Sequence, residues 1–416
     1  MRAVARAAVW TAAIVALSVA RPPALRADDQ TGWLEQQTLT GNWRGYREQL
    51  AEMGILPHLI YRGMMWSNVD GGAAVGTDLT GYLDVGVKLS LHDLGAWPGS
   101  AFRISWHWFQ GPSPTVDLVG GSLAMALSGW EASNAFRFYD IYFEQSLAEK
   151  RFQMKIGQLA ADTDFMASTY AALFLNAAFG DLPSQNLNID APVYPLAAPG
   201  VYAMARPLDW LTTRIAGYTA DPGPDRAGNH GFEWKIGNNA GYTFFGEIAG
   251  SREGAAAGTY TLGGVYTTGG SDQFGIGPEN LDHYEVYAMV DQTVVTDARN
   301  NPKVGVFARM SGSPQDDRNV VGLYADGGVV VYGPIGARPM DAAGIAVSVM
   351  RFTDDYRQQV QATMPTLGSG AAVLELTYQL HLAPWLLVQP DVQVFFDPPL
   401  SGSNAVTLNL QVGLTF

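Results

Sequence analysis

The residues of this chain that could do chemistry are single charged side chains spaced through apolar segments. The sequence holds no G-x-S-x-G, H-E-x-x-H or G-x-x-x-x-G-K-(S/T) motif, and its six His residues are scattered without metal-ligand spacing. There is no Cys, which excludes a disulfide framework, a thiol nucleophile and a thiolate metal site. The charged residues must therefore act through their charge and hydrogen bonds on whatever surface the fold gives them.

These charged residues recur at every second position of short segments. Arg103, Ser105 and His107 alternate with Phe102, Ile104, Trp106 and Trp108. A two-residue period places alternate side chains on opposite faces of a β-strand. The ionisable residues that share such a polar face are Arg62, Asp84, Lys88, Arg103, His107, Arg137, Asp140, Glu144 and Lys155. Opposed rows of Arg and Asp or Glu would orient a dipolar solute, and we rank Arg103, Arg62, Asp140 and Glu144 first; the alternative is that they form interstrand salt bridges that only hold the wall.

The C-terminal segment predicts a strand that spans a membrane. Val406, Leu408, Leu410, Val412, Leu414 and Phe416 would face one side, and Thr407, Asn409, Gln411, Gly413 and Thr415 the other. A spanning strand needs about 9–11 residues of this alternation. Bacterial outer-membrane barrels commonly end on an aromatic residue that the assembly machinery reads, so Phe416 is predicted to be an assembly signal. A half-buried strand of a soluble sandwich is the alternative.

Similar segments recur along the chain. They lie near 58–66, 82–91, 102–108, 136–145, 152–158, 200–207, 210–219, 231–238, 242–250, 258–268, 283–291, 303–310, 320–332, 343–351, 371–382 and 385–396. With the last strand they make seventeen, and because bacterial barrels carry an even number, at least one prediction is wrong and sixteen is preferred. In the 82–91 segment we group Tyr82 with the apolar face. Pro207–Leu208–Asp209 and Ala383–Pro384 predict short periplasmic turns, whereas 269–282 and 352–370 predict external loops.

Two segments break the strand pattern. Residues 40–54 predict one short helix, with Trp43, Tyr46 and Leu50 at helical spacing, a cap at Thr40 or Asn42, and Gly54 as the stop. The stretch from about Asp162 to Pro199 carries four X-Pro pairs, so no continuous strand fits. A connection this long is usually functional. It is predicted to fold inward and narrow a channel; an external loop packed on the rim is the alternative.

The N-terminus predicts export. Arg2 and Arg6 precede an apolar run from Ala7 to Ala20, and cleavage after Ala27 fits the layout of a signal peptide. We therefore expect a signal peptide at 1–27, an N-terminal periplasmic segment with a short helix at 28–57 and an outer-membrane β-barrel at 58–416. Charged residues make up only 15% of the chain and the net charge is −14, which argues against a nucleic-acid partner.

Several stretches, taken in order, resemble the carbohydrate-selective porin family of bacterial outer-membrane barrels. They are Leu39-Thr40-Gly41-Asn42-Trp43-Arg44-Gly45, Tyr142-Phe143-Glu144-Gln145, Lys155-Ile156-Gly157-Gln158, Tyr194-Pro195-Leu196-Ala197-Ala198-Pro199, Glu375-Leu376-Thr377-Tyr378-Gln379-Leu380 and Gln389-Pro390-Asp391-Val392-Gln393. Family members usually show Asp-Trp-Gly-Gly where this chain has Asn42, Trp43, Arg44 and Gly45. The Gly-rich segment 320–342 is a second departure.

The resemblance implies an all-β transmembrane antiparallel barrel of sixteen strands that passes small sugars by facilitated diffusion. It also implies no enzymatic activity, no cofactor and a possible homotrimer. Expected partners are sugars, outer-membrane lipid and lipopolysaccharide, and the barrel-assembly machinery. The alternatives are a barrel tuned to polyols or organic acids, an outer-membrane enzyme, and a secreted sugar-binding β-protein.

A sugar-selective constriction should combine charged or amide groups with aromatic surfaces. The candidates are Arg62, Arg103, His107, Arg137, Asp140, Glu144 and Lys155 on the wall, with Asp164 and Asn176 on the inward loop. Trp66, Trp97, Trp210, Trp234 and Trp385 are predicted to belong to the interfacial girdles of the barrel. The acidic pairs Asp316–Asp317 and Asp354–Asp355 are interpreted as solvated loop charge, with Ca²⁺ binding as the alternative.

Overall fold

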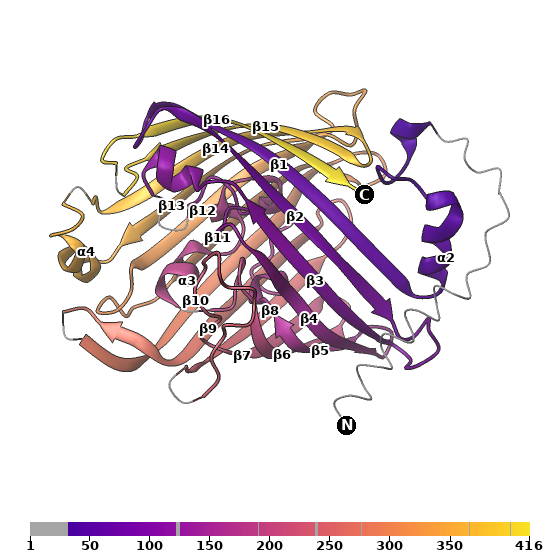
Figure 1. Cartoon of the computed structure of the whole chain (residues 1–416), viewed down its shortest axis with the longest axis horizontal. Coiled ribbons are helices and arrows are strands. Elements are labelled where there is room, and N and C mark those ends of the chain that lie inside the picture. Colours follow the sequence, from indigo (N-terminus) through magenta and orange to yellow (C-terminus); the bar gives the residue numbers. More distant parts are fainter. Residues whose placement is uncertain are drawn as a thin grey trace.

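The strands of this chain close into a single ring. A computed structural model describes residues 32–121, 125–189, 191–237, 240–275, 277–365, 367–399 and 401–416. Within them, sixteen antiparallel strands each pair with their neighbours in sequence, and β1 pairs with β16 to close the barrel (Figure 1). The predicted fold class is confirmed.

The strands have the following bounds. The first eight are β1 (Ile55–Gly71), β2 (Gly76–Ser90), β3 (Ser100–Gln110), β4 (Phe136–Leu147), β5 (Phe152–Leu159), β6 (Ala198–Leu208), β7 (Leu211–Thr219) and β8 (Tyr242–Arg252). The second eight are β9 (Gly258–Gln273), β10 (Gly277–Thr296), β11 (Pro302–Gly312), β12 (Val321–Tyr332), β13 (Ala342–Phe352), β14 (Gly370–Ala383), β15 (Leu386–Phe396) and β16 (Ala405–Thr415).

The short helical elements lie in the connections and before β1. They are η1 (Trp33–Glu35), η2 (Trp43–Gly45), α2 (Tyr46–Glu52), the π-turn η3 (Thr115–Val119), η4 (Ala161–Thr163), η5 (Ala171–Leu173), η6 (Ala177–Phe179), α3 (Pro183–Asn188) and α4 (Asp354–Val360). No helix among the described residues is long and apolar enough to cross a membrane.

The alternation of side chains explains how the ring is built. In β16, Thr407, Asn409 and Gln411 are buried inside the ring, whereas Leu408 is exposed on the outside. β13 shows the same pattern, with Ser348 inside and Val347 outside. An apolar outer face suits lipid, and a closed ring leaves no unpaired backbone edge to be satisfied there.

Three sequence predictions about strands are wrong. Residues 231–237 form no strand and lie instead in the connection between β7 and β8, which removes the seventeenth segment. Strands β9 and β10 run through most of 269–282, leaving only a short hairpin tip, because hairpins can continue beyond the wall without its apolar alternation. Tyr82 shares its face with Asp84 inside the barrel, and Leu83 takes the lipid-facing position.

The predicted helix at 40–54 is shorter than expected. Trp43 and Arg44 have positive φ angles of 51° and 58°, so the regular helix begins only after Gly45. Gly54, with φ 75°, ends it as predicted. This segment lies beside the C-terminal strand end (Figure 1), where Leu39 N donates to Thr415 O at 2.8 Å and Arg47 Nη1 donates to Phe416 O at 3.1 Å.

The two ends of the barrel differ in their connections. At the end that carries α2 and the C-terminus, β6 turns into β7 at Asp209–Trp210 and β14 into β15 at Pro384–Trp385. Both predicted turns exist, but they begin one or two residues later, because Pro207, Leu208 and Ala383 still belong to the strands. The opposite end carries the long connections 111–135, 160–197, 220–241 and 353–369. Short turns are periplasmic and long loops external in such barrels, which orients the molecule.

The five predicted girdle Trp residues separate into four groups. Trp97 and Trp210 are exposed in periplasmic turns, as a girdle requires. Trp66 is buried inside the barrel, where its Nε1 donates to Thr80 Oγ1 at 2.9 Å, so its assignment to a girdle is wrong. Trp385 is covered by Trp33 with a ring-centroid distance of 4.5 Å. Trp234 lies in the 220–241 connection, on the outer face of the barrel.

Candidate functional site

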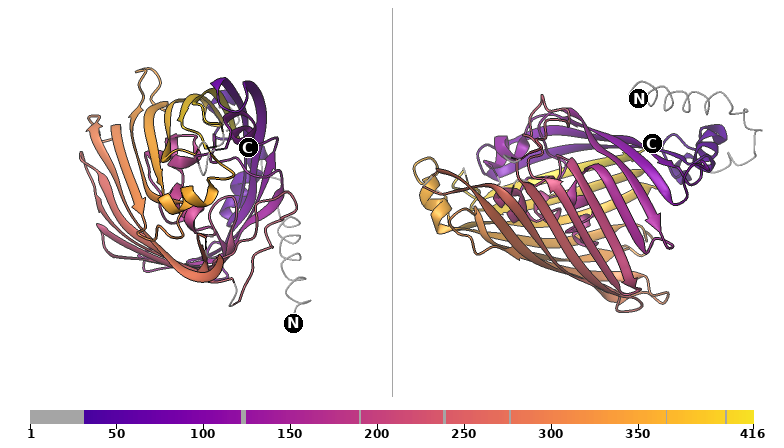
Figure 2. Two further views of the ribbon diagram at one scale, coloured as in Figure 1. Left: turned by 90° about the vertical axis from the view of Figure 1, so that its left-hand side faces the viewer. Right: turned by 90° about the horizontal axis from the view of Figure 1, so that it is seen from below.

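One long connection enters the barrel. We call residues 160–189 and 191–197 the inward loop; Figure 2 (left) looks into the barrel and shows these segments within the ring of strands. Glu375 on β14 is fully buried and accepts hydrogen bonds from Leu175 N at 2.6 Å and Asn176 N at 2.9 Å. Asn176 Nδ2 donates to Gln393 Oε1 on β15 at 2.9 Å. The loop is thus tied to the β14–β15 wall.

Further ties run to β10, β11 and β12. Asp291 accepts from Ser168 Oγ at 2.6 Å and from Thr169 N at 3.1 Å. Arg309 is paired with Asp326 and donates from Nη2 to Ala178 O at 2.8 Å. Buried polar groups cost free energy unless they are hydrogen-bonded. The polar groups of these wall residues and of the loop backbone form hydrogen bonds with one another, so the loop is held in one position on this side of the barrel.

Glycines on the same wall make room for the loop. A Cβ on Gly305 of β11 would lie 2.0 Å from the Tyr170 ring, and one on Gly344 of β13 would lie 2.7 Å from Phe174 Cζ. No side chain fits at such distances, so the loop aromatics lie directly against the strand backbone.

The opposite wall carries a ladder of ion pairs. Asp84 on β2 lies 3.0 Å from His58 Nε2 and 3.6 Å from His107 Nε2. Arg103 Nε lies 3.2 Å from Asp140 Oδ2. Two further pairs join Lys88 to Glu144 at 3.5 Å and Lys155 to Asp164 at 2.7 Å. Each charge thus lies beside its opposite on the same wall, and the ladder presents local dipoles to the inside of the barrel.

Exposure shows on which side the lumen stays open. The side chains of Arg103 and Lys88 are 29% and 37% exposed. On the far wall, Glu375 and Gln393 are 0% exposed. The inward loop thus covers β10–β15 and leaves Arg103 and Lys88 of the ladder partly exposed, whereas Asp140, His107 and Lys155 are buried.

An aromatic cluster lies above the ladder, toward the external end. It consists of Tyr82, His107, Phe109, Trp130, Tyr139 and Tyr194. Trp130 stacks on Tyr82 at 4.9 Å, and Tyr194 from the inward loop meets Trp130 edge-on at 5.7 Å. The Arg62 guanidinium lies 4.8 Å from the Trp130 ring centroid. Among the described residues, no carboxylate oxygen lies within ion-pair distance of Arg62.

The inward loop also carries two half-buried carboxyl groups, those of Asp162 and Asp181. Burial raises the pKa of Asp162, and the neighbouring Asp181 carboxylate raises it further. Asp162 Oδ1 accepts from Tyr194 N at 3.2 Å, which fixes the backbone beside the aromatic cluster. In the described part of the chain, no group of three or more His, Cys, Asp or Glu residues is arranged to hold a metal ion. The acidic pairs at 316–317 and 354–355 therefore do not belong to such a group.

The structure brings together most of the predicted site residues. Arg62, Arg103, His107, Asp140 and Glu144 share the β1–β4 wall, and Lys155 pairs with Asp164 next to it. Two candidates contact loops. The first, Arg137, lies on the same wall, on β4 opposite His107, with its guanidinium 5.2 Å from the Phe109 ring centroid. Arg137 is 1% exposed, with Nη2 2.7 Å from Asp225 Oδ1 of the β7–β8 connection. Asn176 is buried against the far wall. The structure therefore places both at loop anchors.

Sequence reasoning missed five members of the aromatic cluster: Tyr82, Phe109, Trp130, Tyr139 and Tyr194. Tyr82 was grouped with the lipid face, because Tyr suits either side of a membrane strand. Trp130 and Tyr194 lie in connections, where no period assigns a direction. Trp130 and Tyr194 could have been proposed because each is an aromatic residue in a long connection, Trp130 next to Glu131 and Tyr194 next to Pro195.

A closed ring of sixteen membrane-suited strands, an inward loop and a charged lumen define an outer-membrane porin. The carbohydrate-selective porin, OprB family model matches residues 77–416, so the chain belongs to that family. It is a carbohydrate porin of the bacterial outer membrane, and its family and fold are those of channels.

Relatives and solved structures agree with this assignment. Porin B of Pseudomonas aeruginosa is 25% identical, with 86% of this chain and 87% of that protein covered. The putative porin QuiX of Acinetobacter baylyi is 21% identical over 88% and 89%. The high-pH structure of Pseudomonas putida OprB superposes with a TM-score of 0.81 at 20% identity, covering 93% of this chain and 100% of that one. The last likeness concerns the fold.

Proposed function

We propose that small sugars cross this barrel between the inward loop and the β1–β4 wall, and that Arg62 with the aromatic cluster selects them. The observation that carries the proposal is the Arg62 guanidinium, stacked over Trp130 at 4.8 Å and without an ion-pair partner among the described residues. A guanidinium offers fixed donors to sugar hydroxyls. The rings of Trp130 and Tyr194, the partly exposed members of the cluster, offer apolar surface to the C–H faces of the sugar.

The ion pairs on the periplasmic side of the cluster would then bind the solute next along its path. Arg103–Asp140 and Lys88–Glu144 present donors and acceptors together, which matches the mixed character of hydroxyl groups. Because each charge has a partner, the ladder binds weakly, and weak sites let a solute leave as readily as it enters.

Planar-bilayer conductance tests this proposal. The refolded protein should form step-like channels whose current falls as glucose or maltose is added, and a small organic acid should act differently. Trp130→Ala should weaken the sugar block about tenfold, roughly the loss of one aromatic contact, while Arg62→Gln should weaken it and lower anion permeability. Channels that open but ignore every sugar would remove the carbohydrate assignment from this lumen.

A second candidate follows from the same residue. An unpaired guanidinium at an aromatic platform also suits the carboxylate of a small organic acid. Stronger current block by the organic acid than by either sugar, lost in Arg62→Gln, would favour that reading.

The remaining features belong to the same proposal. Residues 1–27 lie outside the described residues, and we propose that they are a signal peptide removed on export. Segment 28–57 would be periplasmic, Phe416 would be read by the barrel-assembly machinery, and the chain would catalyse no reaction and need no cofactor. We also propose that the chain assembles as a homotrimer and contacts lipopolysaccharide.

A further inference from the structure

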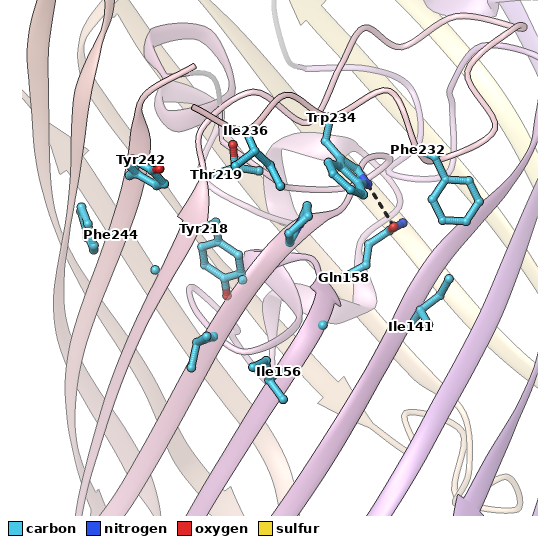
Figure 3. A pocket seen from close by; sticks show the side chains of 15 residues that line it. Ile141, Ile156, Gln158, Tyr218, Thr219, Phe232, Trp234, Ile236, Tyr242 and Phe244 are labelled. Atoms are coloured by element: carbon cyan, nitrogen blue, oxygen red, sulfur yellow. Dashed lines mark hydrogen bonds between the residues drawn. The ribbon is translucent and has the colours of Figure 1, made fainter. Parts of the chain in front are cut away.

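The segment wrongly predicted as a seventeenth strand lies on the outside of the barrel. We call residues 221–237 the external flap. Its apolar side chains Phe232, Trp234 and Ile236 alternate as a membrane strand requires, yet the segment runs over the outer face of β4–β8 near their external ends (Figure 3). The alternation is therefore a real signal of contact with an apolar environment.

The flap is held where the wall is incomplete. Strand β5 is short, and its pairing with β4 begins only at Ile141, opposite Gln158. Above that point Phe138 N donates to His230 O at 3.1 Å, so the flap supplies the acceptor that β5 lacks. Gln158 Nε2 caps Tyr139 O at 3.0 Å, and its Oε1 accepts from Trp234 Nε1 at 3.3 Å. An edge is thus covered by a loop.

Between the flap and the wall lies an apolar groove of about 750 Å³. Tyr242 and Phe244 lie on one side of it and the flap residues Trp234 and Phe232 on the other (Figure 3), and Ile156 and Val201 of the wall also line it. Its size lies within the roughly 300–1,000 Å³ typical of sites that enclose one small molecule. Ile156, Val201 and Phe244 are exposed in it.

We propose that this groove holds an acyl chain of lipopolysaccharide. The groove opens on the lipid-facing side of the wall, at the end opposite the termini, where the outer leaflet supplies lipopolysaccharide. Its lining is apolar, as an acyl chain requires. The flap also places exposed basic groups above it, Arg226 beside Glu233 and Lys235 beside Asp221, at 2.8 and 2.5 Å. Each of these bases is paired with a carboxylate, so the proposal rests on the apolar lining and on the place of the groove on the lipid-facing wall.

The test is photo-crosslinking in intact outer membranes. A benzoylphenylalanine replaces Val201 in the groove or, as the matched control, Val349 on the lipid face of β13, which also lies near the external end of its strand and is exposed to a similar extent, at 46% against 45%. After irradiation, adducts are separated by mass and probed for lipopolysaccharide. The groove position should give severalfold more lipopolysaccharide adduct than the control, and Trp234→Ala should reduce it to the control level.

Other outcomes would overturn the proposal in distinct ways. Equal yields of lipopolysaccharide adduct at both positions would mean that the groove only contacts bulk lipid. An adduct with phospholipid would show that the groove holds a different lipid. A crosslinked dimer of the chain would show that the groove is an interface between copies. Heat-modifiable migration confirms that each variant is folded. If Trp234→Ala does not fold, Trp234→Phe removes the hydrogen bond to Gln158 but keeps a ring, and it should lower the adduct to an intermediate level. Sugar block measured in bilayers should not change, which separates this test from that of the lumen.

Discussion

At the scale of single residues, the Arg103–Asp140 pair sets the charge that a permeating ion meets. Asp140→Asn leaves the Arg103 cation uncompensated, and Arg103→Gln leaves the Asp140 anion. A unit charge about 7 Å away in water contributes about 0.6 kcal/mol, or a change of about threefold in the permeability ratio. We expect Asp140→Asn to favour anions and Arg103→Gln to favour cations, as read from reversal potentials in a salt gradient.

The double variant is the control for this prediction. Removing both charges should return selectivity close to that of the unmodified channel, since the pair is nearly neutral as a whole. Shifts of the same sign in both single variants would show that the mutations act by distorting the wall.

Glu131, next to Trp130, gives the aromatic cluster a dependence on pH. Burial raises its pKa to about 7, helped by the nearby carboxylates of Asp117 and Asp78, while hydrogen bonds from Thr115 Oγ1 at 2.5 Å and Thr115 N at 3.2 Å oppose the shift. A raised pKa in the folded state adds stability at low pH that is lost as pH rises through that value. Local order around Trp130 should therefore fall as the pH rises from about 4.5, the ordinary pKa of a Glu, to about 7, and should level off above that.

Hydrogen exchange of residues 125–135, scaled to each amide's chemical exchange rate, measures this effect. Protection should drop between about pH 5 and about pH 9 in the unmodified protein. Glu131→Gln stays neutral and should remain protected throughout. Equal pH profiles for the two proteins would contradict the assignment to Glu131.

At the scale of elements, the inward loop depends on a few wall residues. Glu375→Ala removes the acceptor for Leu175 N and Asn176 N, and each buried amide left unpaired costs roughly 1–3 kcal/mol. The loop should release from β14, which raises single-channel conductance and abolishes sugar block, while the barrel keeps its heat-modifiable migration. Glu253→Ala, in an exposed turn, is the matched control, and unchanged conductance in Glu375→Ala would show that the loop is held by other contacts.

The wall elements could be predicted from the sequence and the loop contacts could not. The two-residue period of a strand shows which of its side chains share a face, without any knowledge of distant residues. Arg103, Asp140 and Glu144 were therefore placed correctly on the inner face. By contrast, Asn176 meets Gln393 at a separation of 217 residues, and Arg137 meets Asp225 at 88. Alternation gives a side chain its direction but not its partner. Residues 231–237 were wrongly predicted as a strand for a related reason. A segment that lies on the outer wall shows the same alternation of apolar residues as a spanning strand.

At the scale of the whole molecule, the ring closes where its last strand meets its first. β16 pairs with β1 from Thr415 opposite Ile60 to Ala405 opposite Gly71. Phe416 adds one backbone hydrogen bond, from its N to Leu59 O at 3.0 Å, and accepts one from Arg47 at 3.1 Å. Its side chain is only partly buried, so closure of the ring depends little on that side chain.

We therefore expect Phe416→Ser to separate assembly from stability. Insertion into the outer membrane of cells should fall severalfold, because the terminal aromatic is the group that the assembly machinery would read. Refolding from urea into detergent should be nearly unchanged, because the β1–β16 register is intact. Leu408→Ser, an exposed lipid-facing position on the same strand, keeps the terminus and should insert normally. If both variants insert equally poorly, the lipid face of β16 rather than its end limits assembly; if Phe416→Ser also fails to refold, the terminal residue is part of the closing contact.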